Sequence, residues 1–217
     1  EADIIIVPAR TSGSQTEAEG ISLFVVESDL PGISKNNYKS VDGHSASEIT
    51  FKNVEVNKDN LLGEIGKGYQ TLESTIDDAT LAVCAEATGI MKSLHDKTVE
   101  YSKNRVQFGL PIGGFQALQH RMVDTLMACE ETESILLWAL TTNQDDSSSL
   151  KKAISGLKYQ IGTAGKHVGQ EAVQLHGGMG ISWELDIAHF FKRLSSIEIL
   201  FGNADFHMKR FLTLSNN

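Results

Sequence analysis

The sequence predicts an α+β fold, in which a partial antiparallel β-domain over residues 1–62 precedes a C-terminal antiparallel four-helix bundle over residues 63–217. Before residue 60, apolar residues occur in short strand-like runs separated by glycine and proline. After Gly66 they recur every three to five residues, which is the period of one face of a helix. The helical stretches are long and their connections are brief, so we expect them to pack antiparallel.

The first part of the chain contains three segments with the composition of strands, at residues 3–7, 21–27 and 47–55. Turn-forming residues such as the pair Pro31-Gly32 separate them. Because three strands cannot cover their own apolar faces, this part needs further strands, or the helices that follow, to complete its core.

The rest of the chain has a helical pattern interrupted by Pro111 and by a polar run over residues 143–149. The last helix begins at Ser182 or Glu184, breaks around Gly202 and continues as a short piece to Leu214. The helices predicted before it span residues 66–103, 115–142 and 148–176.

The composition limits the classes of function. The chain is 41% hydrophobic and 22% charged, and it carries a net charge of -9, which disfavours binding to nucleic acid or to an anionic membrane. Cys84 and Cys129 lie in apolar helical patterns and are predicted to be buried free thiols in a reducing interior. The histidines are too scattered to predict a metal site, and no run of 18 apolar residues predicts a membrane span.

Two glycine-containing segments carry the candidate binding residues. Arg105, Gln107 and Phe108 precede Gly109 on a tight connection between two helices, an arrangement that suits a phosphate-bearing ligand. The alternative is a surface arginine beside a glycine that ends a helix. The second segment, residues 174–180, places three glycines at a helix end, which alone is weak evidence for a ligand.

Taken together, the two segments resemble the acyl-CoA dehydrogenase family. Residues 105–119 match Arg-x-x-Phe-Gly-x-x-Ile-x-x-Phe-Gln-x-x-Gln, and residues 174–181 match Gln-Leu-His-Gly-Gly-Met-Gly-Ile at the family's spacing. The resemblance extends over essentially the whole chain, and residues 1–60 look like the later strands of the family's central β-domain. Since the family's N-terminal helical domain does not appear before Glu1, the resemblance implies a C-terminal fragment or an incomplete record of a longer protein.

The resemblance implies an acyl-CoA substrate and an FAD cofactor that is bound across a subunit interface. Asn203, in place of the family's usual threonine, is expected to face the FAD of its own subunit. Family members are typically tetramers that pass electrons to an electron-transfer flavoprotein, and a bacterial cytoplasm is favoured over a mitochondrial matrix. The residues implied to contact the cofactor from the neighbouring subunit are Arg105, Gln107, Phe108, Ile112, Gln116, Gln174 and Gly178.

The resemblance leaves the catalytic base open. In this family a carboxylate removes the α-proton of the thioester. Ungapped matching places Phe201 at the usual glutamate position, and it places Ala79 and Thr80 at the alternative glutamate and its neighbouring arginine. Asp77 and Asp78 lie close by and are candidate bases; the alternative is a solvated or helix-capping aspartate pair.

The sequence around Phe201, residues 189–207, is similar to pimeloyl-CoA dehydrogenase small subunits and steroid-side-chain acyl-CoA dehydrogenases, several of which form mixed tetramers. Two hypotheses follow from this resemblance. The protein is either an FAD-dependent acyl-CoA dehydrogenase or a catalytically silent subunit that completes an FAD site while another chain supplies the glutamate. A DNA-associated relative is disfavoured by the negative charge, and a nitroalkane oxidase would be expected to carry an aspartate at position 201.

Overall fold

The computed structural model describes residues 2–143 and 146–216. Its contacts divide the chain into two units, of which the first ends at Ile76 and the second begins at Asp77. The division falls inside a helix because the first turns of that helix approach the strands. A Cβ added at Gly68 would lie only 2.7 Å from the side chain of Leu23. The boundary predicted at residues 62 and 63 instead marks the change from strand to helix.

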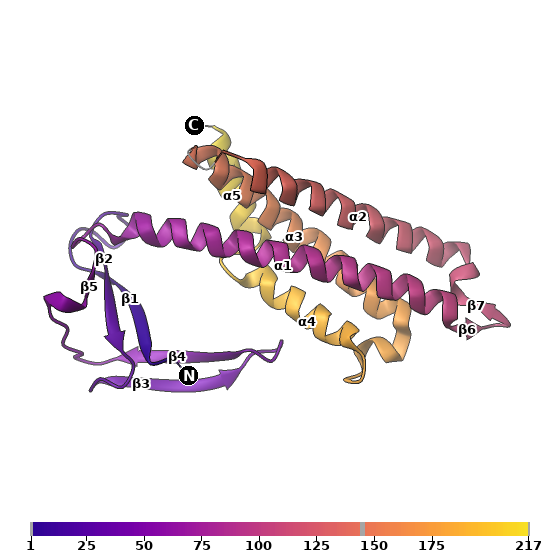
Figure 1. The fold of residues 1–217 in the computed structure, drawn as a ribbon, viewed down its shortest axis with the longest axis horizontal. Helices are drawn as coiled ribbons and strands as arrows, with labels where there is room; N and C mark the ends of the chain where they lie inside the picture. The colour runs from indigo at the N-terminus through magenta and orange to yellow at the C-terminus, as the bar shows by residue number, and fades with distance from the viewer. Residues whose placement is uncertain (1, 144–145, 217) are drawn as a thin grey trace. The chain divides into compact units, whose positions relative to one another are not determined.

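The first unit contains two small antiparallel sheets, which Figure 1 draws in indigo and violet. The three-stranded sheet has the order β1-β2-β5, and its register pairs Ile4 with Glu27 and Arg10 with Ile21. The second sheet consists of β3 and β4. The strands are β1 (Ile4–Arg10), β2 (Ile21–Glu27), β3 (Ile33–Lys39), β4 (Ser45–Phe51) and β5 (Leu61–Leu62).

The strand prediction was wrong in three respects. It missed β3, whose sequence Ile-Ser-Lys-Asn-Asn-Tyr-Lys has few residues that favour strands; β3 forms because its backbone pairs with β4 along its whole length. The strand predicted at residues 47–55 lies at Ser45–Phe51 and ends before Asn53, whose φ of 51° is incompatible with a strand. The first strand continues to Arg10 because β2 is long enough to pair with it there.

The second unit is a helical bundle in which α1, α2, α3 and α4 run alongside one another and α5 packs on α3 (Figure 1). This confirms the predicted α+β fold with a C-terminal helical domain, and the break around Gly202 separates α4 from α5. The helices are α1 (Gly68–Asn104), α2 (Gln116–Thr141), α3 (Ser147–His176), α4 (Asp186–Ile199) and α5 (Ala204–Ser215). Short elements join them: β6 (Val106–Gln107), β7 (Leu110–Pro111), and the 3₁₀ helices η2 (Ile112–Gly114) and η3 (Gly177–Ile181).

Helix α3 forms the centre of this bundle. Its residues Ile154 and Leu157 are completely buried, and its glycines allow neighbouring helices to approach closely. A Cβ added at Gly162 would lie 2.9 Å from the Cβ of Ala204 at the start of α5. Helix α3 therefore fixes the positions of the elements that carry the candidate site residues.

Cys84 and Cys129 are buried and unpaired, as predicted. Burial raises the pKa of the Cys84 thiol to about 12 and that of Cys129 to about 11. Both side chains therefore remain protonated thiols at neutral pH and behave as small apolar core residues.

Candidate functional site

The two glycine-containing segments meet at one end of the bundle. Tyr101 in the last turn of α1 stacks on His176 at the end of α3, with ring centroids 4.3 Å apart. The Tyr101 hydroxyl also donates to the His176 carbonyl over 3.4 Å. Arg105 lies one helical turn after Tyr101, and the glycines at 177 and 178 follow His176 directly. This contact therefore holds the predicted binding residues of both segments near one another.

Phe108 occupies the tip of a hairpin between α1 and α2. Pairing of Gln107 with Leu110 leaves Phe108 and Gly109 as a two-residue loop. Their φ angles are 55° and 83°, as a type I′ turn requires. Phe108 is 89% exposed, and its edge contact with the Phe115 ring, whose centroid lies 6.1 Å away, covers little of a residue held in this strained conformation. The hairpin holds an aromatic ring ready for contact with a group outside the chain.

The other residues predicted in these segments differ in exposure. Arg105, Gln116 and Gln174 are exposed, whereas Ile112 is half-buried. The Gln107 side chain donates to the carbonyl of the residue before it over 2.8 Å. A guanidinium and three amides are thus accessible at this end of the bundle, and they are donors suited to a phosphate or to polar cofactor groups.

Gly178 and Gly180 have different reasons to be glycine. A Cβ at Gly180 would lie 2.4 Å from the carbonyl oxygen of Val173, so the fold itself excludes a side chain there. A Cβ at Gly178 would meet no atom of the chain within 4 Å, and its φ is not positive. None of the described residues requires glycine at position 178, whereas a bound group that approaches the backbone closely would require it.

Replacing Phe108 with glycine separates ligand binding from folding. We expect the free energy of unfolding to change by less than about 1 kcal/mol, because relief of the strain at positive φ is offset by the greater freedom of glycine in the unfolded chain and by loss of the Phe115 contact. We expect FAD affinity to fall by at least tenfold, because the exposed ring is lost. Urea denaturation of the apoprotein and FAD titration check the two effects, with Leu110→Ala as a hairpin control. An FAD affinity that does not change would contradict the assignment of Phe108 to the site.

A second group of predicted residues lies at the turn between α4 and α5. Phe201 has a φ of 57° and Gly202 a φ of 106°, and the Asn203 side chain caps α5 by accepting a hydrogen bond from the Phe206 amide over 3.0 Å. Ala204 packs on Gly162, which is about 21 Å along α3 from His176 at 1.5 Å per residue. Within one chain, the structure therefore does not bring Asn203 to the end of the bundle that carries Arg105.

The two candidate bases lie in different environments. Asp77 is only 5% exposed, and both of its carboxylate oxygens accept hydrogen bonds from Arg210 on α5, over 2.6 and 2.8 Å. The alternative of a solvated or helix-capping pair was therefore wrong for Asp77, because the incoming α5 supplies a cation and shields the carboxylate from water. Asp78 is exposed.

Sequence analysis missed Lys158 and His207, which support the α4–α5 turn. The completely buried Lys158 donates through Nζ to the carbonyls of Glu198 and Gly202, over 2.9 and 2.6 Å. His207 is 1% exposed, and its Nε2 lies 3.0 Å from the Phe201 carbonyl, to which it donates. Lys158 was detectable, since it lies four residues after the buried Ile154 on the apolar stripe of α3. His207 had no comparable signature, because its partner is a backbone carbonyl.

Burial makes His207 a source of acid sensitivity. Burial, with smaller contributions from Lys158 and Arg210, lowers the His207 pKa to about 4, although its bond to Phe201 opposes the shift. The unfolded chain therefore gains a proton near pH 6.5 that the native protein excludes until about pH 4. We expect the free energy of unfolding to fall by about 3 kcal/mol as the pH drops through this range. Urea denaturation at several pH values checks this, and His207→Gln should reduce the slope, of which His95 and His176, whose pKa values burial also lowers, contribute the remainder.

Comparison with known proteins identifies the group to which this architecture belongs. The family model described as "Acyl-CoA dehydrogenase, C-terminal domain" matches residues 66–212. The chain belongs to the acyl-CoA dehydrogenase family. The short-chain specific acyl-CoA dehydrogenase of Megasphaera elsdenii is 32% identical over 210 residues, which cover 93% of this chain and 53% of that protein. The chain thus spans about half the length of the curated relatives that it matches.

Solved structures of acyl-CoA dehydrogenases have the same fold. An acyl-CoA dehydrogenase from Geobacillus kaustophilus superimposes with a TM-score of 0.90 at 27% identity, covering 100% of this chain and 58% of the other. A steroid ACAD variant gives a TM-score of 0.82 at 27% identity, covering 99% of this chain and 55% of the other.

FAD is the cofactor of acyl-CoA dehydrogenases, and the hairpin end of this member's bundle fits it. The exposed Arg105 guanidinium suits a pyrophosphate, the exposed Phe108 ring suits an aromatic system, and Gly178 leaves room for close approach. None of the described residues forms a group of three or more metal-ligating side chains. Among the described helices, none combines the length and apolarity needed to cross a membrane.

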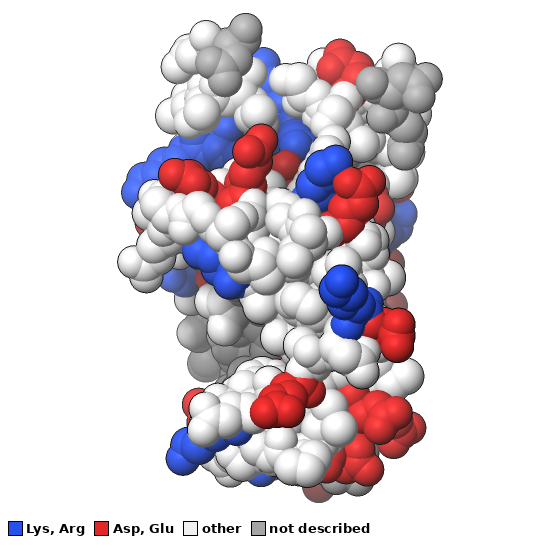
Figure 2. All heavy atoms as spheres, turned by 90° about the vertical axis from the view of Figure 1, so that its left-hand side faces the viewer, with Lys and Arg blue, Asp and Glu red and all other residues white. Residues whose placement is uncertain are grey.

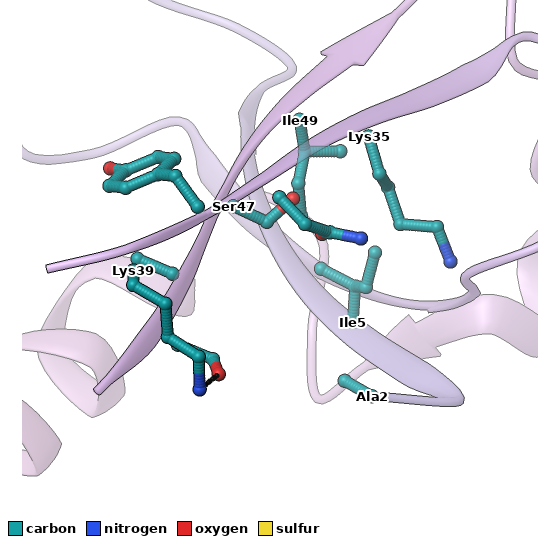
Figure 3. A pocket seen from close by; sticks show the side chains of 10 residues that line it. Ala2, Ile5, Lys35, Lys39, Ser47 and Ile49 are labelled. Atoms are coloured by element: carbon teal, nitrogen blue, oxygen red, sulfur yellow. Dashed lines mark hydrogen bonds between the residues drawn. The ribbon is translucent and has the colours of Figure 1, made fainter. Parts of the chain in front are cut away.

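A cleft of about 720 Å³ lies in the first unit of the chain. Figure 3 shows Ile5 and Ile49 on its walls together with Lys35 and Lys39. The amines of Lys35 and Lys39 donate to serine hydroxyls, over 3.1 and 2.9 Å. No residue that the sequence singled out for cofactor binding or catalysis lines this cleft.

Charge is dispersed on the face that Figure 2 shows. Acidic and basic side chains are both present on this face, and most of its surface is uncharged. The net charge of -9 therefore does not appear there as a continuous acidic layer.

Proposed function

We propose that this protein takes part in the FAD-dependent α,β-dehydrogenation of an acyl-CoA thioester. The family to which the chain belongs supports this reaction. When bound, FAD supplies a hydride acceptor for the β-hydrogen, while a carboxylate must accept the α-proton. The contribution of this chain is then to bind FAD, to position it and to shape the surroundings of the reacting acyl group.

We assign the binding of FAD from the neighbouring subunit to the hairpin end of the bundle. The Arg105 guanidinium holds the pyrophosphate, and Gln107 and the Phe108 ring contact the adenosine side. The half-buried Ile112 adds an apolar contact. These assignments are supported by exposure, by the Tyr101–His176 contact that joins both segments, and by the open space at Gly178. The remaining amides of the proposed half-site are Gln116 and Gln174, and Asn203 faces the FAD of its own subunit.

We propose that the catalytic carboxylate comes from a different chain. The observation that carries this proposal is the ion pair of Asp77, because Arg210 occupies both carboxylate oxygens and burial leaves neither oxygen open to a substrate proton. Phe201 cannot accept a proton at the α4–α5 turn. Asp78 is exposed and is the alternative base, in which case the chain is an acyl-CoA dehydrogenase without a partner's help.

A mixed tetramer, of the kind formed by pimeloyl-CoA or steroid-side-chain dehydrogenases, accommodates such a chain, and a homo-oligomer is the alternative. Exposed large apolar residues on α2 support association between subunits. We further propose an electron-transfer flavoprotein as the electron acceptor and a bacterial cytoplasm as the location. The exposed apolar residues of α2 are Val123, Leu126, Met127, Leu137, Trp138 and Leu140.

Anaerobic reduction of FAD by a panel of acyl-CoAs tests the proposal. The protein is assayed alone and then together with a second acyl-CoA dehydrogenase chain that carries the family's catalytic glutamate. We expect the flavin absorbance to bleach only when the second chain is present, and we expect mutation of that chain's catalytic glutamate to abolish bleaching.

Bleaching with the protein alone would overturn the assignment of the base to another chain. Asp78→Asn then tests whether Asp78 is the base, because loss of bleaching in this variant would identify it. Asp77→Asn is the control at the neighbouring position. If no acyl-CoA bleaches the flavin in either assay, the proposed dehydrogenation is wrong.

A further inference from the structure

Lys158 is a charged residue in the most buried part of the helical unit. It is completely buried and lies on α3 between Ile154 and Ile161, which are also buried. Its Nζ reaches the end of α4, where it donates to the carbonyls of Glu198 and Gly202. Burial lowers the pKa of this amine, whereas Cys84 and Glu198 oppose the shift. A bond to two carbonyls therefore compensates for the removal of this group from water.

The Lys158 ammonium lies where the end of a helix needs hydrogen-bond donors. The last carbonyls of a helix lack partners within the helix and carry a partial negative charge. Lys158 supplies two donors to carbonyls around the end of α4, one in its last turn and one beyond it. An apolar side chain of similar size would stabilise the core without this cost of desolvation. The charge of Lys158 is therefore better explained by its effect on the conformation of the α4–α5 turn than by its contribution to the core.

Three further bonds restrain the same turn. His207 donates to the Phe201 carbonyl over 3.0 Å, the Glu198 carboxylate accepts from the Ala204 amide over 3.3 Å, and Asn203 caps α5. None of these bonds uses the side chain of Phe201, which is 38% exposed. These bonds hold the turn through its backbone and through the cap of α5. The Phe201 side chain takes part in none of them and stays available for contact with a group outside the chain.

We infer that Lys158 is a positioning residue of the FAD site, because its buried ammonium fixes the α4–α5 turn that presents Phe201 and Asn203. The inference rests on the proposed function, in which Asn203 faces the FAD of its own subunit. Loss of the ammonium leaves the carbonyls of Glu198 and Gly202 without their donor. The turn then relaxes, and Phe201 can leave its left-handed conformation.

FAD binding by Lys158 variants tests this inference. Lys158→Met removes the charge at similar size, and Lys158→Arg keeps a cation and several donors. Both are prepared in the assembly in which the unmodified protein holds FAD. We expect Lys158→Met to weaken FAD binding by at least tenfold and to shift the visible absorption maxima of the remaining bound flavin. We expect Lys158→Arg to recover part of the affinity and the original absorption maxima.

Leu157→Ala is the matched control, because Leu157 is completely buried beside Lys158 and has no polar group to offer the turn. It should lower the free energy of unfolding and leave the flavin spectrum unchanged. The inference is overturned if Lys158→Met changes FAD binding and the spectrum no more than Leu157→Ala does. If Lys158→Met does not fold, Lys158→Gln takes its place, since it removes the ammonium and keeps a polar side chain. Unchanged FAD affinity and an unchanged flavin spectrum in Lys158→Gln overturn the inference equally.

The same experiment separates this inference from the proposed function. If the unmodified protein binds no FAD in any assembly, then the proposed FAD half-site fails first. If it binds FAD and the Lys158 variants bind it equally well, only the positioning role of Lys158 fails.

Discussion

Replacing Arg210 with leucine lowers the free energy of unfolding by about 3–5 kcal/mol, which is the expected cost of removing one partner from a buried ion pair. The side chains of Arg210 and Asp77 are 18% and 8% exposed, and two hydrogen bonds join them. The substitution leaves the Asp77 carboxylate buried without its cation. Urea denaturation measures the effect, and thermal unfolding should show a midpoint that is lower by about 6–20 °C.

The double substitution Asp77→Leu with Arg210→Leu separates the cost of an unpaired charge from the value of the pair. We expect it to recover most of the lost stability, because an apolar pair avoids burying a charge. Lys209→Ala, at the exposed neighbouring position, is the control for changes on the surface of α5. A loss below about 1 kcal/mol in Arg210→Leu would mean that the pair behaves like an exposed salt bridge.

Replacing Phe201 with glutamate has the largest effect expected on chemistry. Phe201 matches the position of the family's usual glutamate, so a carboxylate introduced there can accept the α-proton where the α4–α5 turn faces the acyl group. We expect α-proton exchange of a bound acyl-CoA to accelerate by about 10²–10⁴-fold, the usual contribution of a positioned general base. Nuclear magnetic resonance in deuterated water follows the exchange directly and does not depend on electron transfer.

Phe201→Gln is the matched control for this substitution. Glutamine has almost the same shape as glutamate but does not act as a base at neutral pH, so exchange should remain at the level of the unmodified protein. Equal exchange rates in the glutamate and glutamine variants would show that the turn does not face the acyl group.

The helical part of the fold was predictable from local pattern. The apolar period of α1, α2 and α3 placed their ends within two residues of the observed ones, and Gly202 marked the break before α5. The sheets were less predictable, since β3 is polar and depends on its pairing with β4. Whether β3 forms a strand depends on its pairing with β4, so the sequence of β3 alone does not predict it.

The candidate site was predictable only in part. Arg105 and Phe108 stood out because their segment, taken together with residues 174–181, resembles the signatures of the acyl-CoA dehydrogenase family, and their role in binding stays a prediction. The pairing of Asp77 with Arg210 was not predictable, because it depends on the packing of α5 against the beginning of α1. The stack of Tyr101 on His176 was not predictable for the same reason, since it joins positions that are 75 residues apart.

The ion pair between Asp77 and Arg210 also sets an order of events during synthesis. Its partners are 133 residues apart, so at about 5–20 residues per second a ribosome needs roughly 7 to 27 s to make the second partner after the first. Throughout that interval Asp77 lacks the partner that it has in the folded protein. The contact between the beginning of α1 and α5 therefore forms only after the last helix has been made.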